Sequence, residues 1–279
     1  MRRLSCLIFG LAVAGLLHGP AFGQAKKEKT KDSPKKVEFR GPSYKHLDGQ
    51  LVVFVANGAG GSTAVSDNLF DLNSEHNLRL RIQMVPWAKQ DSLFRDLVDQ
   101  ESQINAAARI ACTVEAIRKD APHAHFFFVG QSAGARVVLA AAEMLPAKSV
   151  DRVIVLSPAV SCFYDLTRAL KTSKYGIDNF YSTEDGILEI AEEKVGTAEG
   201  LKTPMAGRVG FRLASSDKKE IEAYRAVRQI RWTQDYCGSG GHFAWTLRHN
   251  LKKTVVPMFF CAPAGDCPTI VLNKKPAKK

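Results

Sequence analysis

One stretch, Phe126–Leu139, limits what this chain can fold into more than any other. A short apolar run, Phe126–Val129, leads into the pattern G-x-S-x-G at Gly130–Gly134, and an Ala- and Leu-rich segment follows. Such an apolar run is typical of a parallel strand that helices cover on both faces. The composition of the segment after it favours a helix. The stretch therefore predicts a strand, a sharp turn and a helix.

The predicted turn has a chemical consequence. Small residues at Gly130 and Gly134 let the chain change direction sharply, which lifts the Ser132 hydroxyl out of the sheet. The first N–H groups of the following helix have no partner within the helix and can face a negatively charged oxygen. A glycine turn without any chemistry has the same local pattern. A nucleophilic serine therefore needs support from residues elsewhere in the chain.

The positive charge of the chain is concentrated at its two ends. The formal net charge is +11. Residues 1–45 hold ten Lys or Arg and three acidic residues, and residues 274–279 hold four Lys and no acid. The part between them, 46–273, holds 25 basic and 25 acidic residues. A neutral central part argues against a nucleic-acid role, and we interpret the basic ends as solvated spacers.

The N-terminus has the pattern of a secretory signal peptide. Arg2 and Arg3 precede an apolar run, Leu4–Leu17, and small residues follow up to Ala25. This run is short for a membrane span, and no later apolar stretch is long enough for one. We therefore expect a chain that is exported, to the periplasm or out of the cell, and that has no membrane span.

Composition divides the chain into four parts. The segment after the signal is Lys-rich and polar, which predicts a disordered linker. The parts are a signal peptide at 1–25, a basic linker at 26–45, one folded domain at 46–260, and a C-terminal segment with a Lys-rich tail at 261–279.

Five cysteines follow the predicted signal peptide, and an odd number leaves at least one thiol unpaired within the chain. Cys261 and Cys267 bracket a short loop and are the best candidates for a disulfide, which export would permit. Cys112 lies in a helical pattern and is predicted to be a small core residue. No cysteine pair has the spacing of a metal site, and we expect neither a metal nor a cofactor.

Strand and helix patterns alternate along the folded domain. Strands are expected at Leu51–Ala56, Leu78–Val85, His125–Val129, Val150–Leu156, Ile177–Tyr181 and Gln229–Thr233. The longest helix is expected at Asp91–Lys119, with Leu97, Ile104, Ala108 and Cys112 on one face. Alternation of this kind predicts an α/β fold with a mostly parallel central sheet and helices on both faces. Only about twenty residues separate Ser157 from Ile177, so no large cap domain is expected and the cleft should be open.

A serine hydroxyl is a poor nucleophile unless a base takes its proton, and His242 is the best candidate for that base. It lies in a glycine loop after the last expected strand, where the side chain can turn towards Ser132. The other histidines lie in the signal peptide, before the serine at element ends, or inside the final helix. A histidine that merely caps a loop is the alternative interpretation.

A histidine base needs a carboxylate that holds its tautomer and stabilises its charged form. Asp185 follows the end of an expected strand and lies between Ser132 and His242 in sequence. Glu184 is adjacent and takes the role if the turn is shifted by one residue. Asp165, after the preceding strand, is the other candidate. Acidic residues in solvated turns are common, so each of the three has that alternative interpretation.

Backbone N–H groups are the expected donors to a developing oxyanion. Ala133 supplies one because it follows the serine. The loop Asn57–Ser62 should supply the second, from Ala59 or, as an alternative, from Gly60. A phosphate-binding loop is the rival interpretation of these glycines, but the Lys-Ser/Thr of a P-loop is missing after them.

The pattern at Gly130–Gly134, the glycine loop after an early strand, and the order Ser132, Asp185, His242 resemble the α/β-hydrolase superfamily. The resemblance covers about Gln50–Val255. It implies a Ser-acid-His hydrolase with its site at the carboxyl ends of the strands. The lipases and esterases of this superfamily often have His-Gly in the early loop, whereas this chain has Asn57-Gly58.

The function predicted on this basis is the hydrolysis of a small-molecule or lipid carboxylic ester through an acyl-enzyme. The predicted partners include no nucleic acid. Two other classes of protein remain open at this point. One is a binding protein that uses the same fold without catalysis, and the other is a cell-surface attachment protein that uses its basic ends.

Overall fold

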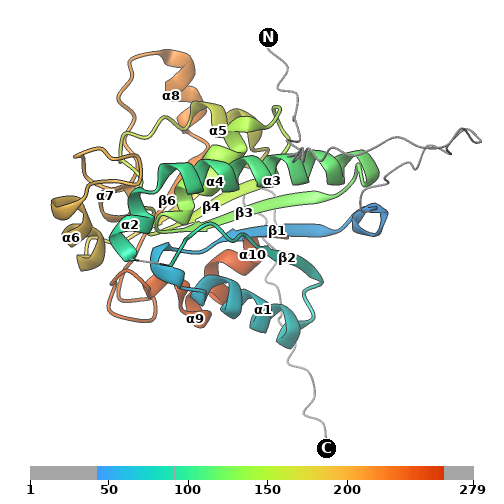
Figure 1. Ribbon diagram of the computed structural model, residues 1–279, viewed down its shortest axis with the longest axis horizontal. Coiled ribbons are helices and arrows are strands. Elements are labelled where there is room, and N and C mark those ends of the chain that lie inside the picture. The colour runs from blue at the N-terminus through green and yellow to red at the C-terminus, as the bar shows by residue number, and fades with distance from the viewer. Residues whose placement is uncertain (1–42, 91, 261–279) are drawn as a thin grey trace, which may run out of the picture. The chain divides into compact units, whose positions relative to one another are not determined.

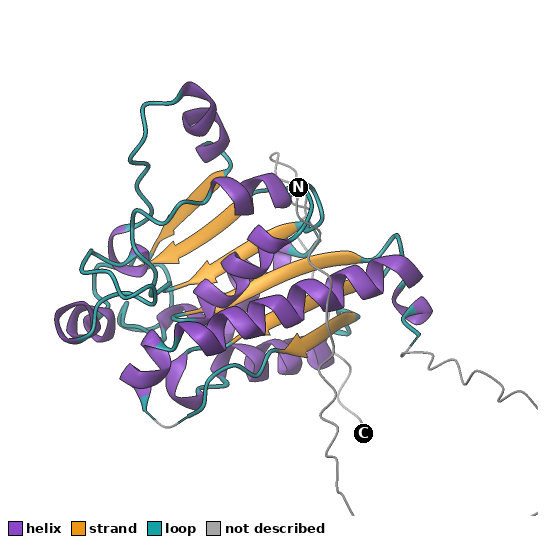
Figure 2. Ribbon diagram, turned by 45° about the horizontal axis from the view of Figure 1, so that its top comes forward, coloured by secondary structure: helices purple, strands orange, loops and turns teal. Residues whose placement is uncertain are grey.

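A parallel six-stranded sheet forms the centre of the computed structural model, which describes residues 43–90 and 92–260. The strand order is β2-β1-β3-β4-β5-β6, and every neighbouring pair is parallel (Figure 2). The strands are β1 (Leu51–Ala56), β2 (Leu80–Met84), β3 (His125–Gln131), β4 (Arg152–Leu156), β5 (Ile177–Tyr181) and β6 (Val227–Arg231). The predicted fold class is confirmed, since helices cover both faces of this sheet (Figure 1).

Alternate residues of the strands enter two separate hydrophobic cores. In β3, Phe126 and Phe128 pack on one face of the sheet, and Phe127 and Val129 pack on the other. The first core is covered by α3 (Gln100–Asp120), α4 (Gly134–Met144), α5 (Thr167–Thr172) and α6 (Gly186–Lys194). The second core is covered by α1 (Ala64–His76) and the helical C-terminal segment. Burial on both faces explains why the central strands are almost wholly apolar.

The predicted helix at Asp91–Lys119 is two helices. The first, α2, is Leu93–Val98, and α3 begins at Gln100. Asp99 separates them with non-helical backbone angles, and its carboxylate accepts a hydrogen bond from the Ser102 N–H at 3.1 Å. An aspartate in this position is a favourable N-cap, because it satisfies an N–H group that the new helix leaves without a partner.

This break also shifts the buried face of the helix. The buried residues of α3 are Gln103, Ala106, Ala107, Ile110, Ala111, Val114 and Ile117. Ile104 and Ala108 are only half-buried, and Cys112 is exposed, so the prediction that Cys112 is a core residue is wrong. The predicted face was extended from Leu97 across the break, where a continuous helical period no longer holds.

The last elements also differ from the prediction in their bounds. The last strand, β6, begins two residues before the predicted Gln229. The closing helix starts with a short turn at Ala244–Thr246 and continues as α9 (Arg248–Asn250), a π-helical stretch (Leu251–Val255) and α10 (Val256–Met258). The segment after α6 contains the short helices α7 (Ala206–Val209) and α8 (Lys218–Tyr224).

The structure also bears on the predictions about the sheet edge, a cap domain and a membrane span. The strand β2 lies at a sheet edge, as predicted. Only one short helix, α5, lies between β4 and β5, so no large cap domain is inserted there. The proposed disulfide, the signal peptide and nearly all of the linker lie outside the described residues. Within the described part of the chain, no helix is both long and apolar enough to cross a membrane.

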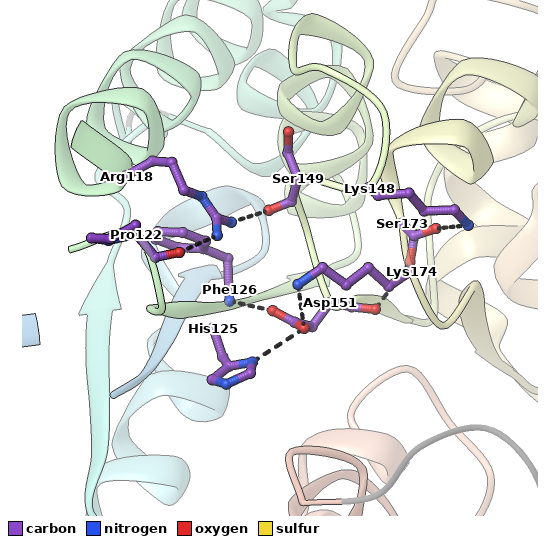
Figure 3. A network of polar contacts seen from close by, with 9 residues as sticks. All are labelled: Arg118, Pro122, His125, Phe126, Lys148, Ser149, Asp151, Ser173 and Lys174. Carbon is purple, nitrogen blue, oxygen red and sulfur yellow. Dashed lines mark hydrogen bonds and ion pairs between the residues drawn. The ribbon is translucent and has the colours of Figure 1, made fainter. Parts of the chain in front are cut away.

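Charged side chains tie the strands together at the amino end of the sheet. Asp151, directly before β4, accepts hydrogen bonds from the Phe126 N–H at 2.8 Å and the Lys174 ammonium at 3.0 Å (Figure 3). The His125 ring lies 3.3 Å from the same carboxylate. Asp151 is only 1% exposed, so these contacts supply the partners that a buried carboxylate requires.

A second buried carboxylate lies on the neighbouring strands. Asp178 of β5 accepts hydrogen bonds from the Arg152 guanidinium of β4 at 2.9 Å and the Arg228 guanidinium of β6 at 2.5 Å. Asp178 and Arg152 are almost completely buried. The ion pairs of Asp178 with Arg152 and Arg228 therefore join the three adjacent strands β4, β5 and β6.

Candidate active site

Ser132 lies in the turn between β3 and α4, in a backbone conformation that is unusual for a serine. Its φ is +55°, in the left-handed region that non-glycine residues seldom adopt. The neighbouring glycines are required by packing. A Cβ on Gly134 would lie 2.2 Å from the Ala56 carbonyl oxygen, and one on Gly130 would lie 2.6 Å from Val138. The strand, turn and helix predicted from the sequence are thus present, with the serine at the turn.

Hydrogen bonds from the end of β4 hold this strained turn in place. The Ser132 N–H donates to the Leu156 carbonyl at 3.0 Å, and the Ser132 carbonyl accepts from the Ala159 N–H at 3.0 Å. Both contacts are to residues of a neighbouring segment of the sheet. The surrounding structure therefore fixes the left-handed conformation, which is how strained residues persist at functional sites.

His242 and Asp185 are in direct contact. The distance between His242 Nδ1 and Asp185 Oδ2 is 2.7 Å, and the two side chains are 3% and 0% exposed. The other carboxylate oxygen of Asp185 accepts the Leu188 N–H at 3.0 Å, so Asp185 is also the N-cap of α6. Because the carboxylate accepts at Nδ1, a neutral His242 ring carries its proton there and has a lone pair at Nε2.

The loop that carries His242 is shaped by a glycine. Gly240 has a φ of +77°, and a Cβ there would lie 2.6 Å from the Trp232 ring. The Phe243 ring packs edge-on against the His242 ring, with 5.3 Å between their centroids. The loop follows β6, and Asp185 follows β5, so the contact joins the carboxyl ends of two neighbouring strands.

The two alternative acids lie in other surroundings. Glu184 is exposed and contacts the Thr183 hydroxyl at 3.3 Å. Asp165 is exposed and accepts the Thr167 N–H at 2.9 Å. The contacts with Thr167 lower the pKa of Asp165. The structure brings only Asp185, of the three candidate acids, into contact with His242.

The two favoured oxyanion donors are both available. Within the described part of the chain, neither the Ala133 N–H at the start of α4 nor the Ala59 N–H forms a hydrogen bond. The alternative donor, the Gly60 N–H, is bonded to the Asp96 carboxylate at 2.9 Å. A donor already held by a carboxylate is a poor one for a second anion, so the geometry favours Ala59 over Gly60.

Three residues that support the oxyanion loop were missed by the sequence analysis in this role. Asp96, 2% exposed, accepts the N–H groups of Gly60, Lys89 and Gln90, at 2.9, 3.1 and 3.1 Å. The Asn57 side chain accepts the Ser66 N–H at 3.2 Å and donates to the Ser66 hydroxyl at 2.9 Å. Trp87 is buried and donates to the Asn57 carbonyl at 2.8 Å. The contacts of Asp96 with Gly60 and of Trp87 with Asn57 join segments that are 36 and 30 positions apart, and no local pattern marks them.

Gln131, which lies between Gly130 and Ser132, was also missed. Its Nε2 lies 3.1 Å from His242 Nε2. No hydrogen bond joins the Ser132 hydroxyl to the His242 ring, although both residues are described. Ser132 and His242 are each 5% exposed, so both residues are largely buried.

Two cavities adjoin the site. One, of about 510 Å³, lies beside His242 and has walls that include Ile187, Phe243 and Leu247. These three side chains are 36%, 45% and 38% exposed, so the cavity offers an apolar surface at the entrance. The second, of about 90 Å³, lies beside the oxyanion loop and is lined by Gly58 and Trp87, among others. Phe163 is 48% exposed, and the Tyr164 hydroxyl donates to Glu143.

The described residues contain no group of three or more His, Cys, Asp or Glu side chains that could hold a metal ion. The chemistry available here is that of a buried serine, an imidazole with a carboxylate partner, and two backbone N–H donors.

No family model matches the sequence, and a comparison with curated proteins finds no match. In structure the chain is similar to the poly(3-hydroxybutyrate) depolymerase LpqC of Bordetella parapertussis, with 14% identity, coverage of 77% of this chain and 81% of that one, and a TM-score of 0.47. It is also similar to the esterase Pf2001 of Pyrococcus furiosus (9% identity, 76% and 83% coverage, TM-score 0.44). A third similar structure is the catalytic core of acetyl xylan esterase from Trichoderma reesei (13% identity, 75% and 97% coverage, TM-score 0.42).

The fold itself follows from the topology of the chain. All six strands are parallel, and a serine with positive φ stands between β3 and its helix. An aspartate and a histidine follow β5 and β6 at the same end of the sheet. This arrangement is the α/β-hydrolase fold.

Proposed function

We propose that this protein is a serine hydrolase that cleaves carboxylic esters, with Ser132 as nucleophile, His242 as base and Asp185 as the acid that orients the base. The observation that carries the proposal is the buried contact of 2.7 Å between His242 and Asp185, at the same sheet end as the strained Ser132. A buried carboxylate at Nδ1 fixes the tautomer whose Nε2 can take a proton from a serine.

The reaction has two stages. In the first, His242 Nε2 takes the Ser132 proton as Oγ attacks the ester carbonyl, and the Ala133 and Ala59 N–H groups stabilise the oxyanion. The tetrahedral intermediate then collapses, and His242 gives the proton to the departing alcohol. In the second stage, His242 activates a water that attacks the acyl-enzyme, which releases the acid and restores Ser132.

The cavity beside His242 supports a substrate with an apolar portion on the leaving-group side. A departing alcohol must lie near Nε2 to receive its proton, and the cavity with Ile187, Phe243 and Leu247 adjoins that ring. A small-molecule or lipid ester fits this description. The N-terminal pattern of the sequence supports action outside the cytoplasm, in the periplasm or beyond the cell.

A panel of p-nitrophenyl esters of graded acyl length tests the reaction class. We expect turnover of oxygen esters, with a loss of activity on acidification, because the base must be unprotonated to accept the Ser132 proton. Cleavage of amides or thioesters with no turnover of any oxygen ester would contradict the ester assignment. Mapping of the peptide labelled by a fluorophosphonate, which mimics the acyl substrate, identifies the nucleophile.

A further inference from the structure

We propose that the carboxamide of Gln131 occupies the place of the substrate's ester group in the free protein and must leave before Ser132 can react. This inference rests on the proposed function. It assigns a role to the residue before the nucleophile that the chemistry of the reaction alone does not require.

The position of the amide nitrogen is the first observation. Gln131 Nε2 lies 3.1 Å from His242 Nε2. With Asp185 at Nδ1, the neutral ring has a lone pair at Nε2 and needs a donor there. The NH₂ group of Gln131 is such a donor. It therefore engages the same lone pair that must accept the proton of the Ser132 hydroxyl.

The position of the amide oxygen is the second observation. A Cβ built on Gly58 would lie 2.2 Å from Gln131 Oε1, so the oxygen lies against the loop that supplies the Ala59 N–H. The same point would be 3.3 Å from the Ser132 Cβ, so the amide passes close to the nucleophile. Gln131 is 2% exposed, which means that this side chain is enclosed in the site.

These two contacts match the parts of an ester. In both groups a planar carbon carries a carbonyl oxygen and a heteroatom. During the proposed reaction the carbonyl oxygen faces the oxyanion loop, and the leaving heteroatom faces His242 Nε2. The carbonyl oxygen of Gln131 lies on the loop side, and its nitrogen lies on the histidine side. Gln131 thus competes with substrate from within the protein. Its amide stays hydrogen-bonded to His242 Nε2 until substrate displaces the amide.

A competitor of this kind has a specific kinetic signature. Substrate can bind only to those molecules in which the Gln131 amide has left the site. Because these are a fraction of all molecules, the apparent affinity of the protein for substrate is reduced by that fraction. Gln131→Ala should lower KM for a short ester about 2–10-fold, the factor that corresponds to one neutral hydrogen bond, with kcat unchanged. The rate of fluorophosphonate labelling should rise by the same factor. A residue needed only for packing would give a lower kcat and no gain in labelling.

Gln131→Glu should act in the opposite direction. A carboxylate beside Nε2 holds the protonated imidazolium and removes the free lone pair, so labelling at neutral pH should be slower than in the unmodified protein. Gln83→Ala is a matched control, because it makes the same change on the edge strand β2, away from the site. It should leave KM and labelling unchanged.

Nitrogen NMR of histidine-labelled protein tests the contact independently of activity. In a Ser132→Ala background, which removes the hydroxyl as an alternative donor, Gln131→Ala should move the His242 Nε2 resonance towards that of an imidazole nitrogen without a hydrogen bond, while the proton on Nδ1 stays in place. An unmoved Nε2 resonance, or labelling of Gln131→Ala that is no faster than that of the unmodified protein, would overturn the proposal. Failure of the proposed function looks different, because the unmodified protein would then neither hydrolyse esters nor be labelled.

Discussion

The two ends of the sheet hold their buried carboxylates in different ways. At the amino end, Asp151 is bonded to a backbone N–H and to Lys174, and Asp178 lies between Arg152 and Arg228 (Figure 3 shows the Asp151 network). At the carboxyl end, Asp185 is bonded to the Leu188 N–H and to an imidazole. Lysine and arginine keep their charge at neutral pH, whereas an imidazole gains or loses it there.

This difference between the partners of the carboxylates separates an end of the sheet that stabilises the fold from an end whose groups can react. The cationic partners at the amino end, Lys174, Arg152 and Arg228, keep their charge at neutral pH, although the His125 ring also lies beside Asp151. The carboxyl end keeps a serine in a strained conformation and N–H groups at Ala59 and Ala133 that no described residue engages. Substitutions at the carboxyl end should therefore change activity, and those at the amino end should change stability.

The largest expected effect is that of Ser132→Ala. Ester turnover and fluorophosphonate labelling should fall by about 10⁴–10⁶-fold, because a triad acts as one unit and only oxyanion donors and binding remain. The free energy of unfolding, measured with urea, should be unchanged, since the substitution removes only a hydroxyl that forms no hydrogen bond with the His242 ring. Label on Ser62, Ser157 or Ser239 instead of Ser132 would show that the site has been wrongly assigned.

Asp185→Asn should have the next largest effect. An asparagine can still cap α6. Its amide can either donate to or accept from His242 Nδ1, so it does not fix the tautomer that has its proton on Nδ1 and its lone pair on Nε2. The value of kcat should therefore fall by about 10³–10⁴-fold. The thermal unfolding midpoint should change little. Glu184→Gln and Asp165→Asn are the matched controls, and a loss as large in either of them would mean that the acid is not Asp185.

Asp178→Asn tests the amino end. Removal of the charge on one member of a buried ion pair typically costs about 3–5 kcal/mol of stability. Urea unfolding should show this loss, while kcat per folded molecule stays unchanged at low temperature. Asp67→Asn, on an exposed side chain, should shift the free energy of unfolding by less than about 0.5 kcal/mol. A variant that remains as stable as the unmodified protein would refute the distinction between the two ends.

Asp99 should give the smallest of these effects and a pH dependence. A hydrogen bond from Lys89, together with bonds from Ser102, lowers the pKa of Asp99 to about 2. The stabilisation is therefore complete above the ordinary aspartate value of about 4 and is lost as the pH falls towards 2. Asp99→Ala should cost about 1 kcal/mol at pH 7, as for other helix N-caps, and less at pH 2. An equal cost at both pH values, measured by urea unfolding, would argue against the carboxylate as the cause.

The parts of the molecule that depend on local sequence could be predicted. The strand at Phe126–Val129, the turn and the following helix are set by burial and by glycine sterics, which the sequence displays directly. Chain order favoured Asp185 as the partner of His242 and left Glu184 and Asp165 as alternatives. The contact forms because Asp185 and His242 follow two neighbouring strands whose carboxyl ends share one edge. Their roles in catalysis remain a proposal.

The features that were missed depend on contacts between distant segments. Asp99 could cap a new helix or continue the old one, and the choice depends on the folded surroundings of Asp96, which binds two N–H groups of the preceding loop and the Gly60 N–H of the loop after β1. The orientation of the Gln131 side chain likewise depends on Gly58 and His242, 73 and 111 positions away in the chain. Neither arrangement leaves a periodic signal in the sequence.

The two glycines of the motif bear on how relatives of this chain should be interpreted. Gly134 faces the Ala56 and Asn57 carbonyl oxygens, and Gly130 faces the helix that follows the turn, so neither position has space for a side chain. A descendant that lost all catalysis would still need both glycines to fold, while nothing in its packing would preserve the serine hydroxyl. The glycines therefore reflect the architecture, whereas Ser132, with His242 and Asp185, is the part of the site that the proposed reaction requires.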